Sequence, residues 1–550
     1  MARKVRVDAG GNGPEGYGIL TSQDFNLIQH TNGCTLTGET AHNLIGLDPL
    51  LGVLMDNGSP TPTHALRVGS PAIEAGDCGG ATNDQRGLIR SVDVPDLANV
   101  SNGCDIGAFE LGVQICPSFV VNTNDDLDFG ACTVGHCSLR EAINAALSCG
   151  KGATIGFGSN VTGAVDLNGS LPALSSELTI LGPGASVLSI RRSTGGEYGI
   201  FTIASNVTAT ITGLTISGGF FEEIAGYGGG VHNAGTLLIR GCVIQNHRAY
   251  YGVGIYNSGM LTVNDSVISG NHCTHDGEGG GIYNTESDSI ELANAGIIGN
   301  VAGNDFSFGG GIYNAGGALR ITKCEIIANS AMGQGAGGGV YNRTGGLVEL
   351  RDTTVHANGA YAGGGLLNEG GSVTAERCTL SGNVAPEDDG GGIWNSGTLL
   401  LVNCTVSGNS SDFSGGGLYC AGTCNITNST IAGNSAFDGG GISGTASVRN
   451  SIVAANATLT DGGVGPDFQG TLNSQDYNFI QRTSGCIILG ATSHNILGKE
   501  PLLGPLAING GPTMTHAPHL HDSKQRGERF QSFHPDSRRR YPSQFSNLPR

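Results

Sequence analysis

Charged residues, proline and long hydrophobic runs are all scarce in this sequence. Only 13 % of the 550 residues are charged, about half the usual share of roughly 25 %. No stretch approaches the roughly 18 consecutive apolar residues of a spanning helix. The first residues, Met1 to Asp8, are basic but lack the apolar core of a signal peptide. The sequence therefore predicts no transmembrane segment and no signal peptide within this chain.

Glycine is the residue in excess, with 95 copies. Collagen is excluded, because there is no Gly-X-Y period and only 18 residues are proline. Disorder is disfavoured, because 38 % of the residues are hydrophobic and they recur in regular short runs. A glycine-rich chain that still has apolar stripes is most simply a tandem repeat. The net charge of −19 argues against nucleic acid and anionic membranes as partners.

Two phrases recur in step from about residue 205 to 456. One is Cys/Ser/Thr-x-Ile/Val-x-x-Asn and the other is Gly-Gly-Gly-Ile-Tyr-Asn. The asparagines of the first phrase are Asn246, Asn271, Asn300, Asn329, Asn358, Asn383, Asn409, Asn434 and Asn456. Those of the second are Asn233, Asn257, Asn284, Asn314, Asn342, Asn368 and Asn395, and Cys420 takes the next place.

The repeat spacing and the hydrophobic pattern predict the fold. The first phrase recurs every 22 to 29 residues, which is too short for a pair of helices. Period-two runs such as Leu319 to Ile321 indicate two or three short strands in each turn. Turns stacked about 4.8 Å apart place like residues above one another. We therefore predict an all-β, right-handed parallel β-helix, a pectin-lyase-like solenoid with a short N-terminal capping helix.

The repeated glycines and asparagines follow from this geometry. Gly-Gly-Gly supplies sharp or φ-positive backbone before each Ile-Tyr-Asn strand. A column of stacked asparagines satisfies backbone groups at a corner, and we interpret both columns as structural ladders. The alternative is that they form a ligand-binding surface.

A capping helix is predicted before the repeats. Ser138 and Glu141 have the spacing of a capping box, an apolar helical face follows, and Gly150 ends it. Capping and surface charge also account for Arg140 and Glu141 without a catalytic role. The 15 cysteines favour an oxidising compartment. Cys132, Cys137, Cys78 and Cys104 are candidates for disulfides, although the sequence alone leaves their connectivity open.

Several segments resemble known bacterial families. Residues 122–143, with Cys-Ser-Leu-Arg-Glu-Ala at 137–142, resemble the CSLREA domain, which precedes right-handed β-helices in exported proteins. The glycine-rich phrases are similar to repeats of polymorphic outer-membrane proteins. Residues 48–52, 60–64, 69–77, 84–87 and 105–110 resemble a choice-of-anchor Q domain. These resemblances imply export and a location outside the cell or on the surface of a bacterium.

Residues 10–65 align without gaps to residues 462–517, with 32 identities in 56 positions. The similarity ends abruptly after Ala517, and a basic tail follows. We interpret the chain as a segment of a larger exported protein, and the tail as the product of a shifted reading frame or, alternatively, as a basic anchor. The predicted domains are closing turns of a preceding unit (1–68), an anchor-Q-like segment (69–112), a CSLREA-like cap (113–152), β-helix repeats (153–470), closing turns (471–517) and a disordered tail (518–550).

Two charged clusters are the places where chemistry is conceivable. Lys323, Asp352 and Arg377 fall on successive turns, flanked by Arg320, Glu349, Arg351 and Glu376, which indicates a salt-bridge ladder or, alternatively, a site for an acidic sugar. The loops before Gly-Gly-Gly carry Asp276, Glu278, Asp305, Asp388, Asp389, Asp412 and Asp438. Of these, Asp388, Asp389, Asp412 and Asp438 are weak Ca²⁺ candidates, and hydration of the loops is the alternative.

No catalytic residue or cofactor site is assigned from the sequence, because the histidines are scattered and no triad or metal spacing is present. Cys242, Cys324, Cys378 and Cys404 fall in one inward column and are expected to pack as small hydrophobic residues. The predicted function is a non-enzymatic surface β-helix of the adhesin, spacer or surface-layer type, which binds an extracellular glycan or surface protein. The alternative is a polysaccharide lyase or glycoside hydrolase, in which acidic and basic groups of three adjacent turns converge.

Overall fold

A computed structural model describes residues 18–55, 57, 61–67, 69–90, 98–111, 118–149, 152–193, 195–222, 226–286, 288–303 and 305–518. The chain divides into two compact units, residues 1–115 and 116–550. The tail predicted to be disordered lies outside the described residues from residue 519 onward.

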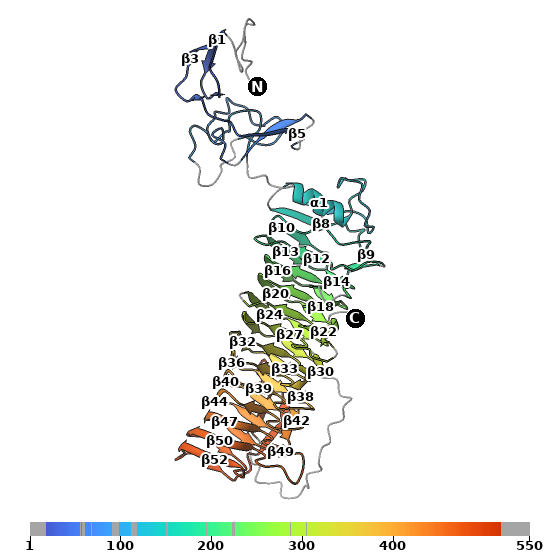
Figure 1. Ribbon diagram of the computed structural model, residues 1–550, viewed down its shortest axis with the longest axis vertical. Helices are drawn as coiled ribbons and strands as arrows, with labels where there is room; N and C mark the ends of the chain where they lie inside the picture. The colour runs from blue at the N-terminus through green and yellow to red at the C-terminus, as the bar shows by residue number, and fades with distance from the viewer. Residues whose placement is uncertain are drawn as a thin grey trace. The chain divides into compact units, whose positions relative to one another are not determined.

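The second unit is a parallel β-helix in which consecutive turns pair in register (Figure 1). One turn consists of β27 (Ile312–Asn314), β28 (Ala318–Thr322), β29 (Glu325–Ile327) and β30 (Ser330–Ala336). β31 (Val340–Asn342) begins the next turn and pairs in parallel with β27, so that Tyr341 lies beside Tyr313 and Asn342 beside Asn314. Identical side chains therefore stack along the axis, as predicted.

Equivalent strands of successive turns form four rows. The first row contains the Ile-Tyr-Asn strands β12 (Phe201–Ile203), β15 (Val231–Asn233), β19 (Ile255–Asn257), β23 (Ile282–Asn284), β27, β31, β35 (Leu366–Asn368), β39 (Ile393–Asn395) and β43 (Leu418–Cys420). The second row contains β7 (Ser118–Val121), β8 (Ala153–Phe157), β10 (Leu178–Leu181), β13 (Thr208–Thr212), β16 (Thr236–Arg240), β20 (Met260–Asn264), β24 (Ser289–Ala293), β28, β32 (Leu347–Arg351), β36 (Ser372–Glu376), β40 (Thr398–Val402) and β44 (Thr423–Thr427). β47 (Ile442–Arg449), β50 (Phe468–Gln475) and β52 (Cys486–Ala491) continue these rows at the C-terminal end.

The third row is a 14-stranded sheet made of β9 (Gly163–Leu167), β11 (Leu188–Arg192), β14 (Thr215–Ser217), β17 (Val243–Gln245), β21 (Val267–Ser269), β25 (Gly296–Ile298), β29, β33 (Thr354–His356), β37 (Thr379–Ser381), β41 (Thr405–Ser407), β45 (Thr430–Ala432), β48 (Ile452–Ala454), β51 (Phe479–Ile480) and β53 (Ile496–Leu497). The fourth row is a 9-stranded sheet made of β18 (Arg248–Tyr251), β22 (His272–Glu278), β26 (Val301–Ala302), β30, β34 (Gly359–Ala362), β38 (Val384–Ala385), β42 (Ser410–Ser411), β46 (Ser435–Ala436) and β49 (Ala457–Thr458).

The middle turns thus have four strands, where the sequence predicted two or three. Five strands of the fourth row have only two residues, as in Val301–Ala302, and are too short to show a period-two pattern. The core fills the inside of the coil. Leu319, Ile321 and Ile326 are at most 1 % exposed, whereas Arg320 between them points to solvent. Burial of these inward side chains is the main favourable term in folding.

Each Gly-Gly-Gly corner requires glycine for steric reasons. Gly309 adopts a φ of 67°, in the left-handed region. A Cβ on Gly310 would lie 2.5 Å from the Ser330 backbone, and one on Gly311 would lie 2.5 Å from the Gly339 carbonyl oxygen. The backbone of one turn therefore touches the next here, and no side chain fits between them.

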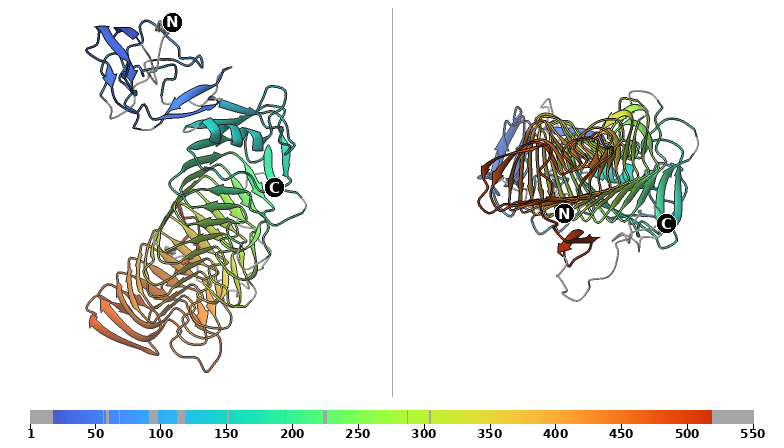
Figure 2. Two further views of the ribbon diagram at one scale, coloured as in Figure 1. Left: turned by 45° about the horizontal axis from the view of Figure 1, so that its top comes forward. Right: turned by 90° about the horizontal axis from the view of Figure 1, so that it is seen from below.

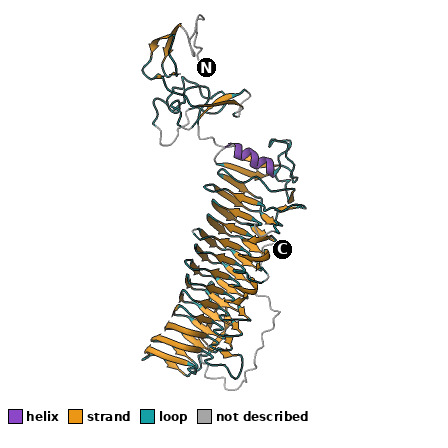
Figure 3. Cartoon of the chain, in the orientation of Figure 1, coloured by secondary structure: helices purple, strands orange, loops and turns teal. Residues whose placement is uncertain are grey.

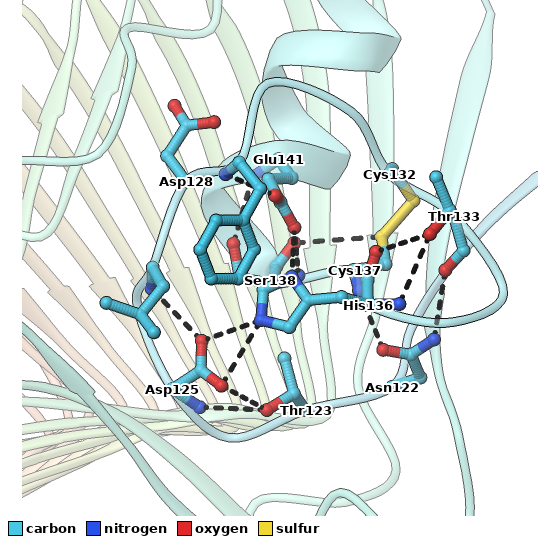
Figure 4. A network of polar contacts seen from close by, with 12 residues as sticks. Asn122, Thr123, Asp125, Asp128, Cys132, Thr133, His136, Cys137, Ser138 and Glu141 are labelled. Atoms are coloured by element: carbon cyan, nitrogen blue, oxygen red, sulfur yellow. Dashed lines mark hydrogen bonds and ion pairs between the residues drawn. A yellow bond between two sulfur atoms is a disulfide. The ribbon is translucent and has the colours of Figure 1, made fainter.

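The single helix of the described residues, α1 (Leu139–Cys149), caps the first turns of the β-helix (Figure 3). The Ser138 amide donates to Glu141 Oε2 (2.9 Å), and the Glu141 amide donates to Ser138 Oγ (3.2 Å), which is the reciprocal capping box (Figure 4). Glu141 also accepts from the Phe129 amide and contacts His136 Nδ1 at 2.8 Å. A disulfide joins Cys132 to Cys137 in the loop before the helix. Arg140 forms an ion pair with Asp126 (2.7 Å), so both residues named in the sequence have structural partners.

The first unit contains β1 (Gly18–Gln23), β2 (Leu27–Ile28), β3 (Cys34–Glu39), β4 (Leu44–Ile45), β5 (Leu51–Met55) and β6 (Thr63–Leu66). β1 pairs in parallel with β3 as β50 does with β52, and β5–β6 form a hairpin like β54 (Leu503–Ala507) with β55 (Thr515–Pro518). Asp24 holds His42 in the first copy as Asp476 holds His494 in the second, at 2.6 Å in both. A disulfide joins Cys78 to Cys104 in the segment that follows. In the second unit, the matching strands β50–β53 lie at the end of the β-helix opposite α1 (Figure 2).

Candidate binding face

Two buried ladders of asparagine amides run along the corners of the β-helix. The Asn314 ladder consists of Asn233, Asn257, Asn284, Asn314, Asn342, Asn368 and Asn395. The Asn329 ladder consists of Asn271, Asn300, Asn329, Asn358, Asn383, Asn409, Asn434 and Asn456. Each Nδ2 donates to Oδ1 of the next turn, over 2.6 to 2.9 Å in the first ladder and 2.9 to 3.0 Å in the second. These amides are at most 1 % exposed, so they face the interior and not a ligand.

The Asn329 ladder begins at His247, and the prediction that Asn246 belongs to it was wrong. Gln245 pairs with Ser269, so His247 and not Asn246 lies in register with Asn271. The His247 ring replaces an amide, because Nδ1 accepts from the Gly219 amide (2.9 Å) and Nε2 donates to the Ile216 carbonyl (3.0 Å). Complete burial lowers the pKa of His247 to about 4.

The same ladder ends at Asp467, which has acceptors only. Asp467 Oδ1 accepts from both the amide and Nδ2 of Asn456, and Oδ2 accepts from the Arg482 amide at 2.7 Å. Burial raises the pKa of this carboxyl despite these hydrogen bonds. The Asn314 ladder ends differently, at Cys424 Sγ (3.4 Å), and Cys424 is bonded to Cys420 in a disulfide that the sequence did not reveal.

The charged column on the outer face is an ion-pair ladder. Arg377 contacts Asp352 (2.7 Å), Arg351 contacts Glu376 (2.8 Å) and Arg320 contacts Glu349 (3.6 Å). The Arg377 side chain lowers the pKa of Asp352. Most of these side chains are exposed, and such pairs contribute roughly 0–1 kcal/mol each. The column therefore neutralises itself and leaves little free charge for an acidic sugar.

Two of the four proposed Ca²⁺ ligands accept hydrogen bonds from backbone amides. Asp389 Oδ1 accepts from the Ser414 amide (2.8 Å), and Asp438 Oδ1 accepts from the Val464 amide (2.7 Å). Asp388 is partly exposed and Asp412 is exposed. Across the described part of the chain, no group of three or more His, Cys, Asp or Glu side chains is placed to hold a metal ion. Cys242, Cys324, Cys378 and Cys404 are buried and free, as expected for an inward column.

Two columns of side chains lie side by side at the Gly-Gly-Gly corner, and we call them the binding face. The strand column is the central position of the first row, and it contains His232, Tyr256, Tyr283, Tyr313, Tyr341, Leu367, Trp394 and Tyr419. The corner column is the residue before each Gly-Gly-Gly, or before Gly-Val-Gly in one turn. It contains Tyr227, Tyr251, Glu278, Phe308, Ala336, Ala362, Asp389, Ser414 and Asp438.

The rings of the strand column stack on one another. Tyr256, Tyr283, Tyr313 and Tyr341 are nearly parallel, with centroids 5.0 to 5.2 Å apart. Tyr227 stacks on Tyr251 in the corner column with centroids 5.5 Å apart. The two columns meet edge to face, since the Tyr251 and Tyr283 rings are inclined at 70° and 5.6 Å apart.

Glu278 is the charged residue in the part of the corner column where the neighbouring turns carry Tyr227, Tyr251 and Phe308. Burial raises the pKa of Glu278 to about 6, although Arg343 and a hydrogen bond with Tyr313 oppose the shift. Two turns further on, the Tyr341 hydroxyl donates to Glu369 Oε2 at 2.6 Å. In the sequence Glu278 stood among the acidic loop residues. Its position directly before Gly-Gly-Gly, where Tyr227, Tyr251 and Phe308 stand in neighbouring turns, is the signal that distinguishes it.

Comparisons with known proteins found one family model and several solved structures. A family model described as a right-handed β-helix region matches residues 198–379. The A-module of mannuronan C-5 epimerase AlgE6 from Azotobacter vinelandii is 14 % identical, with 69 % of this chain and 98 % of that chain covered and a TM-score of 0.38. The AlgE4 A-module of the same organism is 15 % identical, with 68 % and 99 % covered and a TM-score of 0.39. Tailspike protein 3 of bacteriophage CBA120 is 14 % identical, with 68 % and 60 % covered and a TM-score of 0.30.

No curated protein matches the sequence. Among the described residues, none of the helices is long and apolar enough to span a membrane. The chain has the predicted fold, an all-β right-handed parallel β-helix with one short helix in the part that the structure describes.

Proposed function

We propose that the chain is a non-enzymatic β-helix repeat protein of a bacterial cell surface or the extracellular space, which acts as an adhesin, spacer or surface-layer component. The observation that carries this proposal is the pair of unbroken amide ladders. Because each turn from Asn233 to Asp467 hydrogen-bonds to the next inside the corners, the coil is held together along these turns. Such a rod holds a binding face at a fixed distance from an anchor.

Two sequence resemblances and the disulfides support export. The capping segment around α1 resembles a CSLREA domain, and residues 69–112 resemble a choice-of-anchor Q segment. Cys78–Cys104, Cys132–Cys137 and Cys420–Cys424 are disulfides, which persist mainly in oxidising compartments.

The partner in this proposal is an extracellular glycan or a surface protein, bound along the binding face. The test is a glycan array probed with the full chain, with and without Ca²⁺. Binding that is lost in a Tyr256→Ala variant but kept in Asn425→Ala, which changes the outward side of β44, supports the proposal. Binding that both variants keep places the contact elsewhere.

A second function, a carbohydrate-active enzyme, is favoured by one observation. Glu278, Arg343 and Glu369 lie on different turns around Tyr313 and Tyr341, so acidic and basic groups do converge at this face. The test is incubation of the full chain with polygalacturonate and with alginate, followed by measurement of reducing ends and unsaturated products. Cleavage by the wild type that is lost in Glu278→Gln overturns the non-enzymatic proposal.

A further inference from the structure

Glu278 occupies a place in the corner column where neighbouring turns carry rings. Glu278 pairs with Tyr251 on one side and with Phe308 on the other. Successive turns are about 4.8 Å apart, so Tyr251 and Phe308 are separated by about 9.6 Å. The backbone pairing therefore places Glu278 between two turns that carry aromatic residues, where a carboxylate stands in place of a third ring.

Residues of the strand column lie beside Glu278 and Tyr251. The Tyr283 ring meets Tyr251 edge to face, and Tyr313 lies near enough to Glu278 to oppose the rise in the pKa of that carboxyl. The cluster is open on its outer side: Tyr227 is 39 % exposed, and Glu278, Tyr251 and Tyr283 are each partly exposed. A small group arriving from solvent therefore meets aromatic rings and a carboxylate together.

The charge around the cluster is negative. Glu278 and Glu369 both interact electrostatically with Arg343, whose pKa they raise. The chain as a whole carries a net charge of −19. Aromatic rings attract cations to their faces, by about 0.5–2 kcal/mol for each contact. A carboxylate beside the rings strengthens this attraction, whereas it repels an anion.

We propose that the cluster of Tyr227, Tyr251, Tyr283, Tyr313 and Glu278 is a binding site for an organic ammonium group. Glu278 supplies the opposite charge, and Tyr251 with Tyr283 supplies the aromatic walls. The inference deepens the proposed function, on which it rests, because it names the chemistry of the partner: a lysine side chain or an amino sugar.

The test is calorimetric titration of the full chain with n-butylammonium, which mimics a lysine side chain, and with uncharged n-butanol. We expect the ammonium to bind and the alcohol not to bind. Glu278→Gln should weaken ammonium binding by about tenfold. Glu349→Gln is the matched control, because it removes the same charge from the outer ion-pair ladder, and it should leave binding unchanged. Equal losses in both variants, or no loss in Glu278→Gln, overturn the proposal.

The pH dependence gives a second readout. The titratable groups that act on or with Glu278 are Tyr250, Tyr251, Tyr283, Tyr313, Tyr341, Cys273 and Arg343. Burial raises the pKa of Tyr251 and of Cys273 to about 12, so both groups stay uncharged between pH 5 and pH 7.5. Binding should therefore strengthen about tenfold from pH 5 to pH 7.5 as Glu278 ionises. A flat profile in the wild type contradicts the assignment.

Two further arms distinguish the sources of the ammonium. Glucosamine and N-acetylglucosamine differ in the charge of one nitrogen, so preference for glucosamine indicates an amino sugar. Preference for n-butylammonium over glucosamine indicates a lysine side chain. If N-acetylglucosamine binds as well as both amines, the ammonium site is refuted but the proposed non-enzymatic, glycan-binding function is not. If the chain cleaves a glycan, the non-enzymatic function is refuted but the ammonium site is not.

Discussion

Replacement of one asparagine in the middle of the Asn329 ladder tests how the β-helix is held together. Asn329 is 1 % exposed, and its side chain takes part in four hydrogen bonds. Its Nδ2 donates to the Ile297 carbonyl (2.8 Å) and to Asn358 Oδ1 (3.0 Å). Its Oδ1 accepts from the amide and from Nδ2 of Asn300, both at 3.0 Å.

Asn329→Ala removes all four bonds and leaves the buried Asn300 amide without its acceptor. A stranded buried polar group costs about 1–3 kcal/mol, and a truncated side chain adds a cavity. We expect the free energy of unfolding to fall by about 3–5 kcal/mol. Asn329→Asp should be worse at pH 7, because a carboxylate has no donor for Ile297 or Asn358. It should recover partly as the pH falls, because burial raises the pKa of such a carboxyl and protonation restores a donor.

The assay is urea denaturation of the full chain followed by far-UV circular dichroism. Asn425→Ala is the control, because Asn425 points outward from β44, and it should change stability by no more than about 0.5 kcal/mol. If Asn329→Ala behaves like Asn425→Ala, the ladder does not stabilise the coil and the reasoning is refuted.

Four further results are expected. His247→Asn should leave the free energy of unfolding unchanged at pH 7 and make the chain more resistant to acid. Burial lowers the pKa of His247 to about 4, so the stability that its neutral form contributes to the wild type is lost as the pH falls from about 6.5 towards 4. Urea midpoints at pH 7 and pH 4.5 check this. Asp467→Asn should destabilise the chain by about 1–3 kcal/mol in the same assay, because a donor would then face the Arg482 or Asn456 amide. Gly310→Ala should lower the melting temperature sharply, whereas Gly156→Ala, whose added Cβ meets nothing within 4 Å, should not. Because the pKa of Glu278 is raised to about 6, its contribution to stability is complete below about pH 4.5 and lost as the pH rises through 6, so Glu278→Gln should flatten the stability profile between pH 5 and pH 7.

Much of the fold could be predicted because every turn of the β-helix repeats the same sequence pattern. The Asn and Gly-Gly-Gly positions marked the corners, and the alternation in runs such as Leu319 to Ile321 marked the inward face. The incorrect prediction concerned one position in the repeat. The register at Asn246 was misread because the adjacent His247 performs the amide's task with ring nitrogens, and residue type alone does not show that equivalence.

The binding face was harder to predict, because it depends on two columns that are not adjacent in sequence. Tyr283 recurs in an obvious phrase, but Glu278 lies in a loop whose length differs between turns. Only the pairing of Glu278 with Tyr251 and Phe308 shows that it sits among rings. Burial then gives this carboxyl an environment unlike that of the exposed Asp412 in a comparable loop.

The direction of the Asn329 ladder has a consequence for how such a chain changes in length. Every amide donates toward the C-terminal end, from Asn271 to Asn456, and only the first and last members differ from the rest. A gene duplication or deletion of one whole turn in the middle therefore leaves each remaining amide with a donor on one side and an acceptor on the other. The ladder geometry is therefore compatible with different numbers of turns between His247 and Asp467, the residues at its two ends.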